Sequence, residues 1–155
     1  MIQIAPGNLV SVESEGKFYY GLVLDRVRLF GGNWTFVFHE VSDRLLPPEG
    51  LVNGGRAGYH AFVDFIWAKR ERRLTRIARR VETSSFEGPR RLKNTAALKE
   101  KAKLWFIYDM DFKELKRVPR LTAEEAKLPL NERIDDVIMV QRVKERWTPE
   151  QDPRI

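Results

Sequence analysis

The chain has 155 residues and a mass of 18.2 kDa, a size that suits one folded domain. It contains no cysteine, which excludes disulfides, thiolate metal sites and cysteine nucleophiles. The N-terminal residues lack the basic and apolar regions of a signal peptide. No apolar run approaches the ~20 residues of a membrane span, so we expect a cytoplasmic protein with no membrane partner.

The net charge of +6 is concentrated in the middle of the chain. Residues 56–103 carry 14 basic and 5 acidic side chains, whereas the segments before and after them are slightly acidic. Residues 69–80 alone hold seven lysines and arginines. This density suits a surface that faces nucleic acid or an acidic protein, and it equally suits a solvated surface that aids solubility.

The first 41 residues predict three strands, over 9–13, 18–27 and 33–41. Aromatic and β-branched residues dominate these runs. The pairs Glu15-Gly16 and Gly31-Gly32 are typical of turns between them. We therefore expect an antiparallel meander, which must curl or be covered to hide its apolar face.

Residues 42–59 read as a long loop, and residues 61–67 as a fourth strand. The apolar residues Leu74, Ile77, Ala78 and Val81 then fall at helical spacing. The residues between them are almost all basic, which favours an amphipathic helix with outward-facing arginines. A strand within residues 69–81 stays open as the alternative.

The C-terminal half predicts further elements. Residues 96–103 suit a short helix, and residues 104–108 suit a strand. Thr122 and Glu125 have the spacing of a helix capping box. Asn131 is placed to cap a last helix, although Val137-Ile138-Met139-Val140 fits a strand equally well.

Together these elements predict an α+β fold. Its centre is a small antiparallel sheet or an SH3-like barrel, with helical additions in the C-terminal half. We expect a single globular domain over 1–147 and a frayed tail over 148–155.

Catalytic patterns are weak in this sequence. Asp109 and Asp111 follow a predicted strand and have a spacing that can share a divalent ion, but a polar turn is the more frequent cause of such a pair. Asp64 lies in an apolar run, where a general base is less expected than a solvent-facing ion pair. His39 and His60 are interpreted as hydrogen-bonded residues. We therefore predict no catalytic residue, no metal and no cofactor, with a metal-dependent nuclease as a distant alternative.

Aromatic side chains on a small sheet can stack bases. The candidates are Trp34, Phe36, Phe38, Tyr19 and Tyr20. A core role is favoured for the first three. Tyr19 and Tyr20 point to opposite faces, so we expect one of them to be exposed.

The N-terminal strands resemble the opening of the immunity protein 26 family, small bacterial proteins associated with polymorphic toxin systems. The residues that carry this resemblance are 6–12, 16–24 and 34–38, and the strand Leu104–Tyr108 is similar to a tryptophan-bearing strand of that family. The match covers about a third of the chain, and the basic middle segment departs from the family pattern. The resemblance implies a non-catalytic protein that binds and blocks a cognate toxin.

We therefore expect a non-catalytic protein-binding module, an immunity protein that neutralises a bacterial toxin. The basic segment would bind an acidic toxin surface through complementary charge. We therefore predict that the toxin is not neutralised by mimicry of nucleic acid through residues 69–80. The residues predicted to contact the partner are Tyr19, Arg70, Arg72, Arg73, Arg76, Arg79 and Arg80. The alternative is a small β-barrel that binds nucleic acid through its arginine-rich face, residues 69–80.

Overall fold

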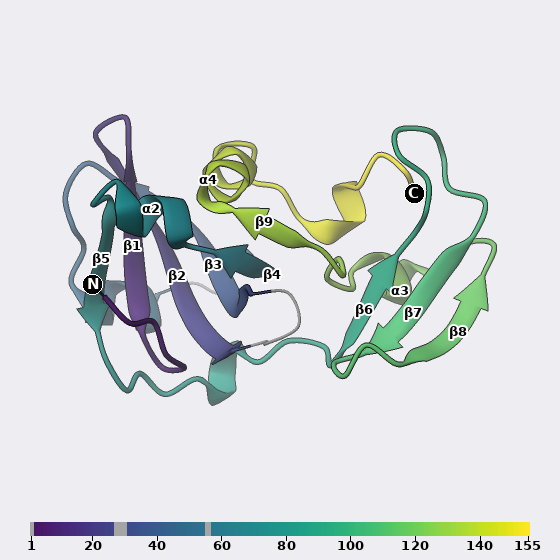
Figure 1. Cartoon of the computed structure of the whole chain (residues 1–155), viewed down its shortest axis with the longest axis horizontal. Coiled ribbons are helices and arrows are strands. Elements are labelled where there is room, and N and C mark those ends of the chain that lie inside the picture. The colour runs from purple at the N-terminus through teal and green to yellow at the C-terminus, as the bar shows by residue number, and fades with distance from the viewer. Residues whose placement is uncertain (1, 27–30, 55–56) are drawn as a thin grey trace. The chain divides into compact units, whose positions relative to one another are not determined.

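The computed structural model describes residues 2–26, 31–54 and 57–155. Contacts divide the chain into two compact units (Figure 1). Unit 1 comprises Met1–Glu87 with Arg133–Trp147, and unit 2 comprises Gly88–Glu132 with Thr148–Ile155. Each unit is assembled from two separate stretches of chain. The single domain over 1–147 stays a prediction, because units defined by contacts do not determine how many domains fold independently.

The C-terminal residues 148–155 are ordered within unit 2 rather than frayed. A short 3-10 helix, η2 (Pro149–Gln151), begins at a capping box formed by Thr148 and Gln151. Arg154 pairs with the buried carboxylate of Asp152 at 2.7 Å. These polar contacts attach the end of the chain to the rest of unit 2. The pattern of apolar residues in this segment does not predict them.

Unit 1 is built on a six-stranded sheet in the order β5-β1-β2-β3-β4-β9. The predicted meander is confirmed, since β1 (Leu9–Ser14), β2 (Lys17–Arg26) and β3 (Asn33–Ser42) pair antiparallel in sequence. In the turn between β1 and β2, Glu15 and Gly16 have φ values of 51° and 74°. Positive φ at both residues is typical of two-residue hairpin turns that match the right-handed twist of the strands. The predicted fourth strand is also present, as β4 (Gly58–Asp64).

The predicted helix over 74–81 is wrong. The chain forms a five-residue helix, α2 (Ile66–Arg70), and then strand β5 (Leu74–Ala78), which pairs antiparallel with β1. Leu74 packs in the cluster on one face of the sheet, whereas Ile77 and Ala78 pack against the other. The pairing with β1 shifts register between Leu9 and Val10. This bulge turns the consecutive residues Ile77 and Ala78 toward the same face of the sheet. The spacing of apolar residues therefore resembles that of a helix although the segment is a strand.

Apolar clusters cover both faces of this sheet. On one face α4 (Asp136–Lys144) contributes Met139, Val140 and Val143 to the core, and Figure 1 shows α4 lying over the strands. The other face is covered by α1 (Pro48–Val52) and the 3-10 helix η1 (Ser84–Phe86). The sheet ends at β5 and β9 (Arg133–Asp135), so across the described residues it is open and not a closed barrel.

Unit 2 contains a three-stranded antiparallel sheet in the order β6-β7-β8. Its strands are β6 (Arg91–Asn94), β7 (Trp105–Asp109) and β8 (Glu114–Val118). The predicted capping box is confirmed at the start of α3 (Ala123–Ala126). Residues 96–103 form bends and irregular coil rather than the predicted helix. Asp135, not Asn131, caps α4, because its carboxylate accepts the Ile138 amide.

The α+β class is thus confirmed. Helices account for a minor part of the chain, and two of them, α3 and α4, lie in its C-terminal half as expected.

Candidate functional site

The arginine-rich segment occupies one rim of unit 1. It runs through α2, a turn over residues 71–73, and the edge strand β5. The turn and the residues after β5 contain arginines with left-handed backbone, Arg72 at φ 57° and Arg80 at φ 55°. The segment therefore changes direction at both ends of β5 and spreads its side chains around the sheet edge.

The six predicted contact arginines fall into two groups. Arg73 is occupied: it pairs with buried Asp136 at 2.8 Å and with Glu71 at 2.6 Å, and it donates to the Glu13 carbonyl. Arg76 donates to the Gln3 carbonyl and is half-buried. The other four are exposed and form no ion pair within the described part of the chain: Arg70, Arg72, Arg79 and Arg80.

Tyr19 does not belong to this surface. Its side chain is only 2% exposed and packs in the core on the α4 face. Tyr20 is buried on the opposite face, where its hydroxyl contacts Ser42 and accepts the Leu46 amide. The expectation that one of this pair is exposed is wrong, because clusters cover both faces of the sheet. Trp34, Phe36 and Phe38 are also buried, so these five aromatics offer no platform for stacking bases.

The sequence analysis did not identify two exposed apolar side chains in α2. Ile66 is 45% exposed and Trp67 is 55% exposed. The guanidinium of Arg70 lies over the Trp67 ring, 5.2 Å from its centroid. Exposed tryptophan and arginine are the residues most enriched at protein-binding hot spots. The signal was present in the sequence, but reading 61–67 as one strand assigned Trp67 to the sheet.

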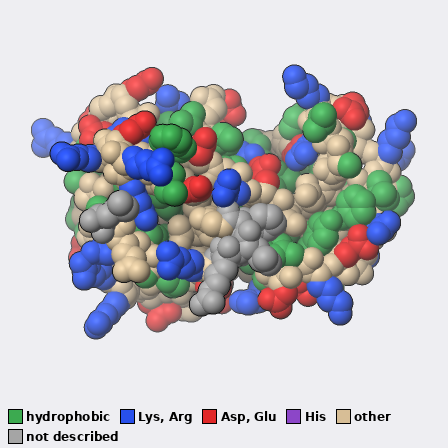
Figure 2. Space-filling model, viewed as in Figure 1, with side chains coloured by type: hydrophobic (Ala, Val, Ile, Leu, Met, Phe, Trp, Pro, Cys, Tyr) green, Lys and Arg blue, Asp and Glu red, His purple; other side chains and the backbone are tan. Residues whose placement is uncertain are grey.

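The start of α4 adds more exposed apolar surface at the same end of the sheet. Strands β4 and β9 run parallel, with Asp64 opposite Asp135, so α2 and α4 both begin just beyond that end. Val137 and Ile138 in α4 are 66% and 43% exposed. Figure 2 shows hydrophobic and basic side chains next to one another over this part of unit 1. Arg73 pairs with Asp136 at the start of α4, so we call the surface formed by residues 66–73 and 137–138 the α2 face.

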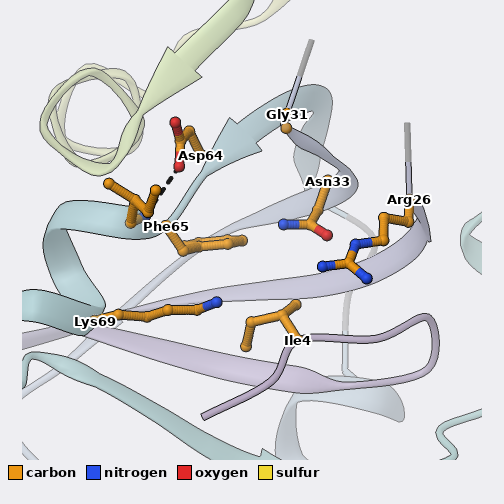
Figure 3. Close-up of a pocket in the computed structure, with 9 residues that line it drawn as sticks. Ile4, Arg26, Gly31, Asn33, Asp64, Phe65 and Lys69 are labelled. Carbon is orange, nitrogen blue, oxygen red and sulfur yellow. Dashed lines mark hydrogen bonds between the residues drawn. The ribbon is translucent and has the colours of Figure 1, made fainter. Parts of the chain in front are cut away.

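A pocket of about 340 Å³ opens at the edge of the α2 face and shares Ile66 and Lys69 with it. Its apolar residues include Ile4 and Phe65, and its polar residues include Arg26, Asn33 and Lys69. In Figure 3 the side chains of Arg26 and Lys69 extend toward each other from opposite sides of this pocket. Both come from element ends, Arg26 from the last residue of β2 and Lys69 from α2.

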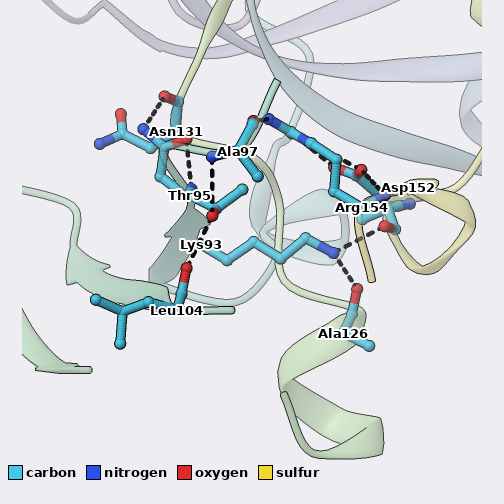
Figure 4. Close-up of polar contacts among 10 residues, drawn as sticks. Lys93, Thr95, Ala97, Leu104, Ala126, Asn131, Asp152 and Arg154 are labelled. Carbon is cyan, nitrogen blue, oxygen red and sulfur yellow. Dashed lines mark hydrogen bonds and ion pairs between the residues drawn. The ribbon is translucent and has the colours of Figure 1, made fainter. Parts of the chain in front are cut away.

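Unit 2 contains a buried cation. Lys93 is 0% exposed, and its ammonium donates to the carbonyls of Ala126 at 2.5 Å and Pro149 at 2.7 Å (Figure 4). Burial lowers its pKa to about 8, although the charges of Asp152 and Glu150 oppose this. These bonds tie β6 to α3 and to the C-terminal segment, which makes Lys93 a structural residue.

The acidic candidates are explained by local structure. The Asp109 carboxylate accepts the amides of Asp111 and Lys113 and so closes the turn after β7. Asp64 accepts the Ile66 amide and lies 3.9 Å from Arg133. Among the described residues there is no group of three or more histidines or carboxylates placed to hold a metal ion.

Both histidines are hydrogen-bonded to backbone carbonyls. His39 Nε2 lies 2.8 Å from the Trp147 oxygen, and His60 Nε2 donates to the Phe86 oxygen at 2.6 Å. Burial lowers the pKa of His60, whose ring also stacks on Trp34. Each ring thus helps to hold a neighbouring segment against the sheet.

In the part of the chain that the structure describes, no helix has the length and apolar character needed to cross a membrane. Comparison with protein-family models, with curated proteins and with solved structures finds no match to this chain.

Proposed function

We propose that this chain is a non-catalytic protein-binding module and that the α2 face is its contact surface. The observation that carries the proposal is the exposed Trp67 with Arg70 over its ring, beside arginines that have no ion pair within the described residues. A folded chain gains little by exposing a tryptophan, because burying such a side chain is worth several kcal/mol. Trp67 and Arg70 are therefore the central anchors of the proposed contact.

The charge of the face favours an acidic partner surface. Arg70 and Arg72 raise the association rate with such a surface and select against basic ones. Ile66, Val137 and Ile138 supply apolar area that would be removed from water in the complex. We further propose that the partner is a cognate bacterial toxin, as the resemblance to the immunity protein 26 family implies, and that binding blocks it.

The test uses the genes that adjoin this chain's own gene. Each neighbouring product is expressed in a heterologous bacterium, with and without this chain. We expect one neighbour to arrest growth, the chain to restore growth, and the two to form a stoichiometric complex by size-exclusion chromatography. The variant Arg70→Glu with Trp67→Ala should lose both rescue and complex, whereas Lys103→Glu, an exposed cation in unit 2, should retain both.

Two results would overturn the proposal. One is rescue that survives the double variant, which would move the contact elsewhere. The other is a chain that binds random-sequence DNA or RNA in fluorescence anisotropy, with affinity falling steeply between about 50 mM and about 200 mM salt. That result would assign the exposed arginines to phosphate contacts.

A further inference from the structure

The pocket beside the α2 face presents two cations to one small volume. Arg26 and Lys69 line it with the Asn33 side chain, and within the described residues neither cation has an ion pair. Arg26 is exposed and Lys69 is half-buried, and like charges that share a pocket repel one another. An anion between them would relieve it and accept charge-assisted hydrogen bonds from both sides.

The one acidic residue of the pocket is already occupied. Asp64 accepts the amide of Ile66 and faces Arg133 at 3.9 Å. Arg133, which is not among the lining residues, therefore partly offsets the negative charge of Asp64. The positive charges of Arg26 and Lys69 then outweigh the negative charge within the pocket. Figure 3 shows the Asp64 carboxylate bonded toward the start of α2 rather than toward Arg26 or Lys69.

The rest of the lining is apolar and close to backbone. Phe65 is 2% exposed and Ile4 is also buried, so both side chains are held by the core. Gly31 and Gly32 bring main chain to the opposite wall, and Gly31 has φ +68°, which favours glycine. The volume of about 340 Å³ lies at the lower end of the range of small-molecule sites.

We propose that this pocket binds a small organic anion. A phosphate or carboxylate group lies between Arg26 and Lys69 and accepts a hydrogen bond from the Asn33 amide, while a compact apolar body lies against Phe65 and Ile4. The site shares Ile66 and Lys69 with the α2 face, but anion binding can be measured on the chain alone, without the protein partner proposed above.

The experiment titrates the full chain with phenyl phosphate and follows backbone amides by ¹H–¹⁵N NMR. Inorganic phosphate, benzoate and the neutral phenol serve as comparison probes. We expect phenyl phosphate to shift the amides of Gly31, Gly32 and Phe65–Lys69, with phosphate and benzoate weaker and phenol inactive. Arg26→Gln and Lys69→Gln should each weaken binding about tenfold.

Arg79→Gln is the matched control, because it removes the same charge from an exposed residue that does not line this pocket. It should leave the affinity for phenyl phosphate within about twofold. The proposal is overturned if phenyl phosphate shifts none of these amides, if Arg26→Gln and Lys69→Gln bind as well as wild type, or if Arg79→Gln weakens binding as much as they do. NMR spectra with undisturbed core amides show that each variant is folded.

Discussion

In unit 1 Arg70, Arg72, Arg79 and Arg80, which have no ion pair among the described residues, lie at the rim of a sheet whose two faces are covered by apolar clusters. Unit 2, in contrast, buries Lys93 beside Trp105. The rim arginines contribute little to folding, because exposed charges remain solvated. Lys93 is fully desolvated, and its ammonium replaces water with two carbonyl oxygens. The comparison shows that the burial and hydrogen-bond partners of a cationic side chain decide whether it stabilises the fold or is available to a ligand. The density of basic residues along the sequence does not decide this.

Truncation of Lys93 should give the largest effect on stability. Lys93→Ala removes a buried four-carbon stem and leaves the carbonyls of Ala126 and Pro149 without a donor. At pH 10, where the amine of the folded chain is neutral, we expect a loss of about 4 kcal/mol in the free energy of unfolding. Urea unfolding followed by circular dichroism measures it.

The matched control is Lys103→Ala, which removes the same side chain from an exposed position in the same unit. It should change the free energy of unfolding by less than about 0.5 kcal/mol. Equal effects of the two substitutions would mean that Lys93 is not the structural residue that its burial indicates.

The pH dependence of stability should show the same buried cation. The pKa of Lys93 is about 8 in the folded chain against 10.5 ordinarily. Between these values the unfolded chain binds a proton that the folded chain does not, so the free energy of unfolding rises with pH across this window. We expect a gain of up to about 3 kcal/mol from pH 8 to 10.5.

Lys93→Met isolates this contribution, because it keeps the stem and removes the titrating group. The difference between wild type and Lys93→Met, measured by urea unfolding at several pH values, should shift in favour of wild type as the pH rises. A difference that stays constant from pH 8 to 10.5 would show that Lys93 titrates as an ordinary lysine.

A third prediction compares two adjacent arginines of the α2 face. Arg73→Gln leaves Asp136 buried without its ion pair, and removing one member of such a pair is strongly destabilising. Since Arg73 keeps some solvent contact, we expect a loss of about 2 kcal/mol. Arg72→Gln has no ion pair to break among the described residues and should cost less than about 0.5 kcal/mol.

Thermal and urea unfolding of the two variants provide the measurement. Similar losses at both positions would place Arg72 in the structural group with Arg73. It would then have to be removed from the surface proposed to bind the partner.

The sequence predicted local order well and long-range assembly poorly. The strands of the meander, the strand at 104–108 and the capping box at Thr122 follow from alternation and from a four-residue pattern, and all are present. The division into two units depends on which distant stretches pack together. No periodicity within a single stretch records that.

The candidate site was predicted only in part. The density of arginines over 69–80 located its basic residues, but Arg73 is paired by Asp136, 63 residues further along the chain. Tyr19 is buried because α4, from the far end of unit 1, covers the face it points to. Trp67 is exposed because β4 ends at Asp64 and the chain turns into α2. Each outcome depends on a boundary or a distant contact.

The smallest expected effect on stability tests whether Trp67 is free for a partner. Phe65 and Trp67 lie two residues apart, one 2% and the other 55% exposed. Phe65→Ala should cost about 3 kcal/mol by leaving a cavity in the core, whereas Trp67→Ala should change the free energy of unfolding by less than about 0.5 kcal/mol. Urea unfolding of both variants gives the comparison. A loss above about 1 kcal/mol for Trp67→Ala would show that the fold itself uses this side chain, and the α2 face would lose the anchor on which its proposed role depends.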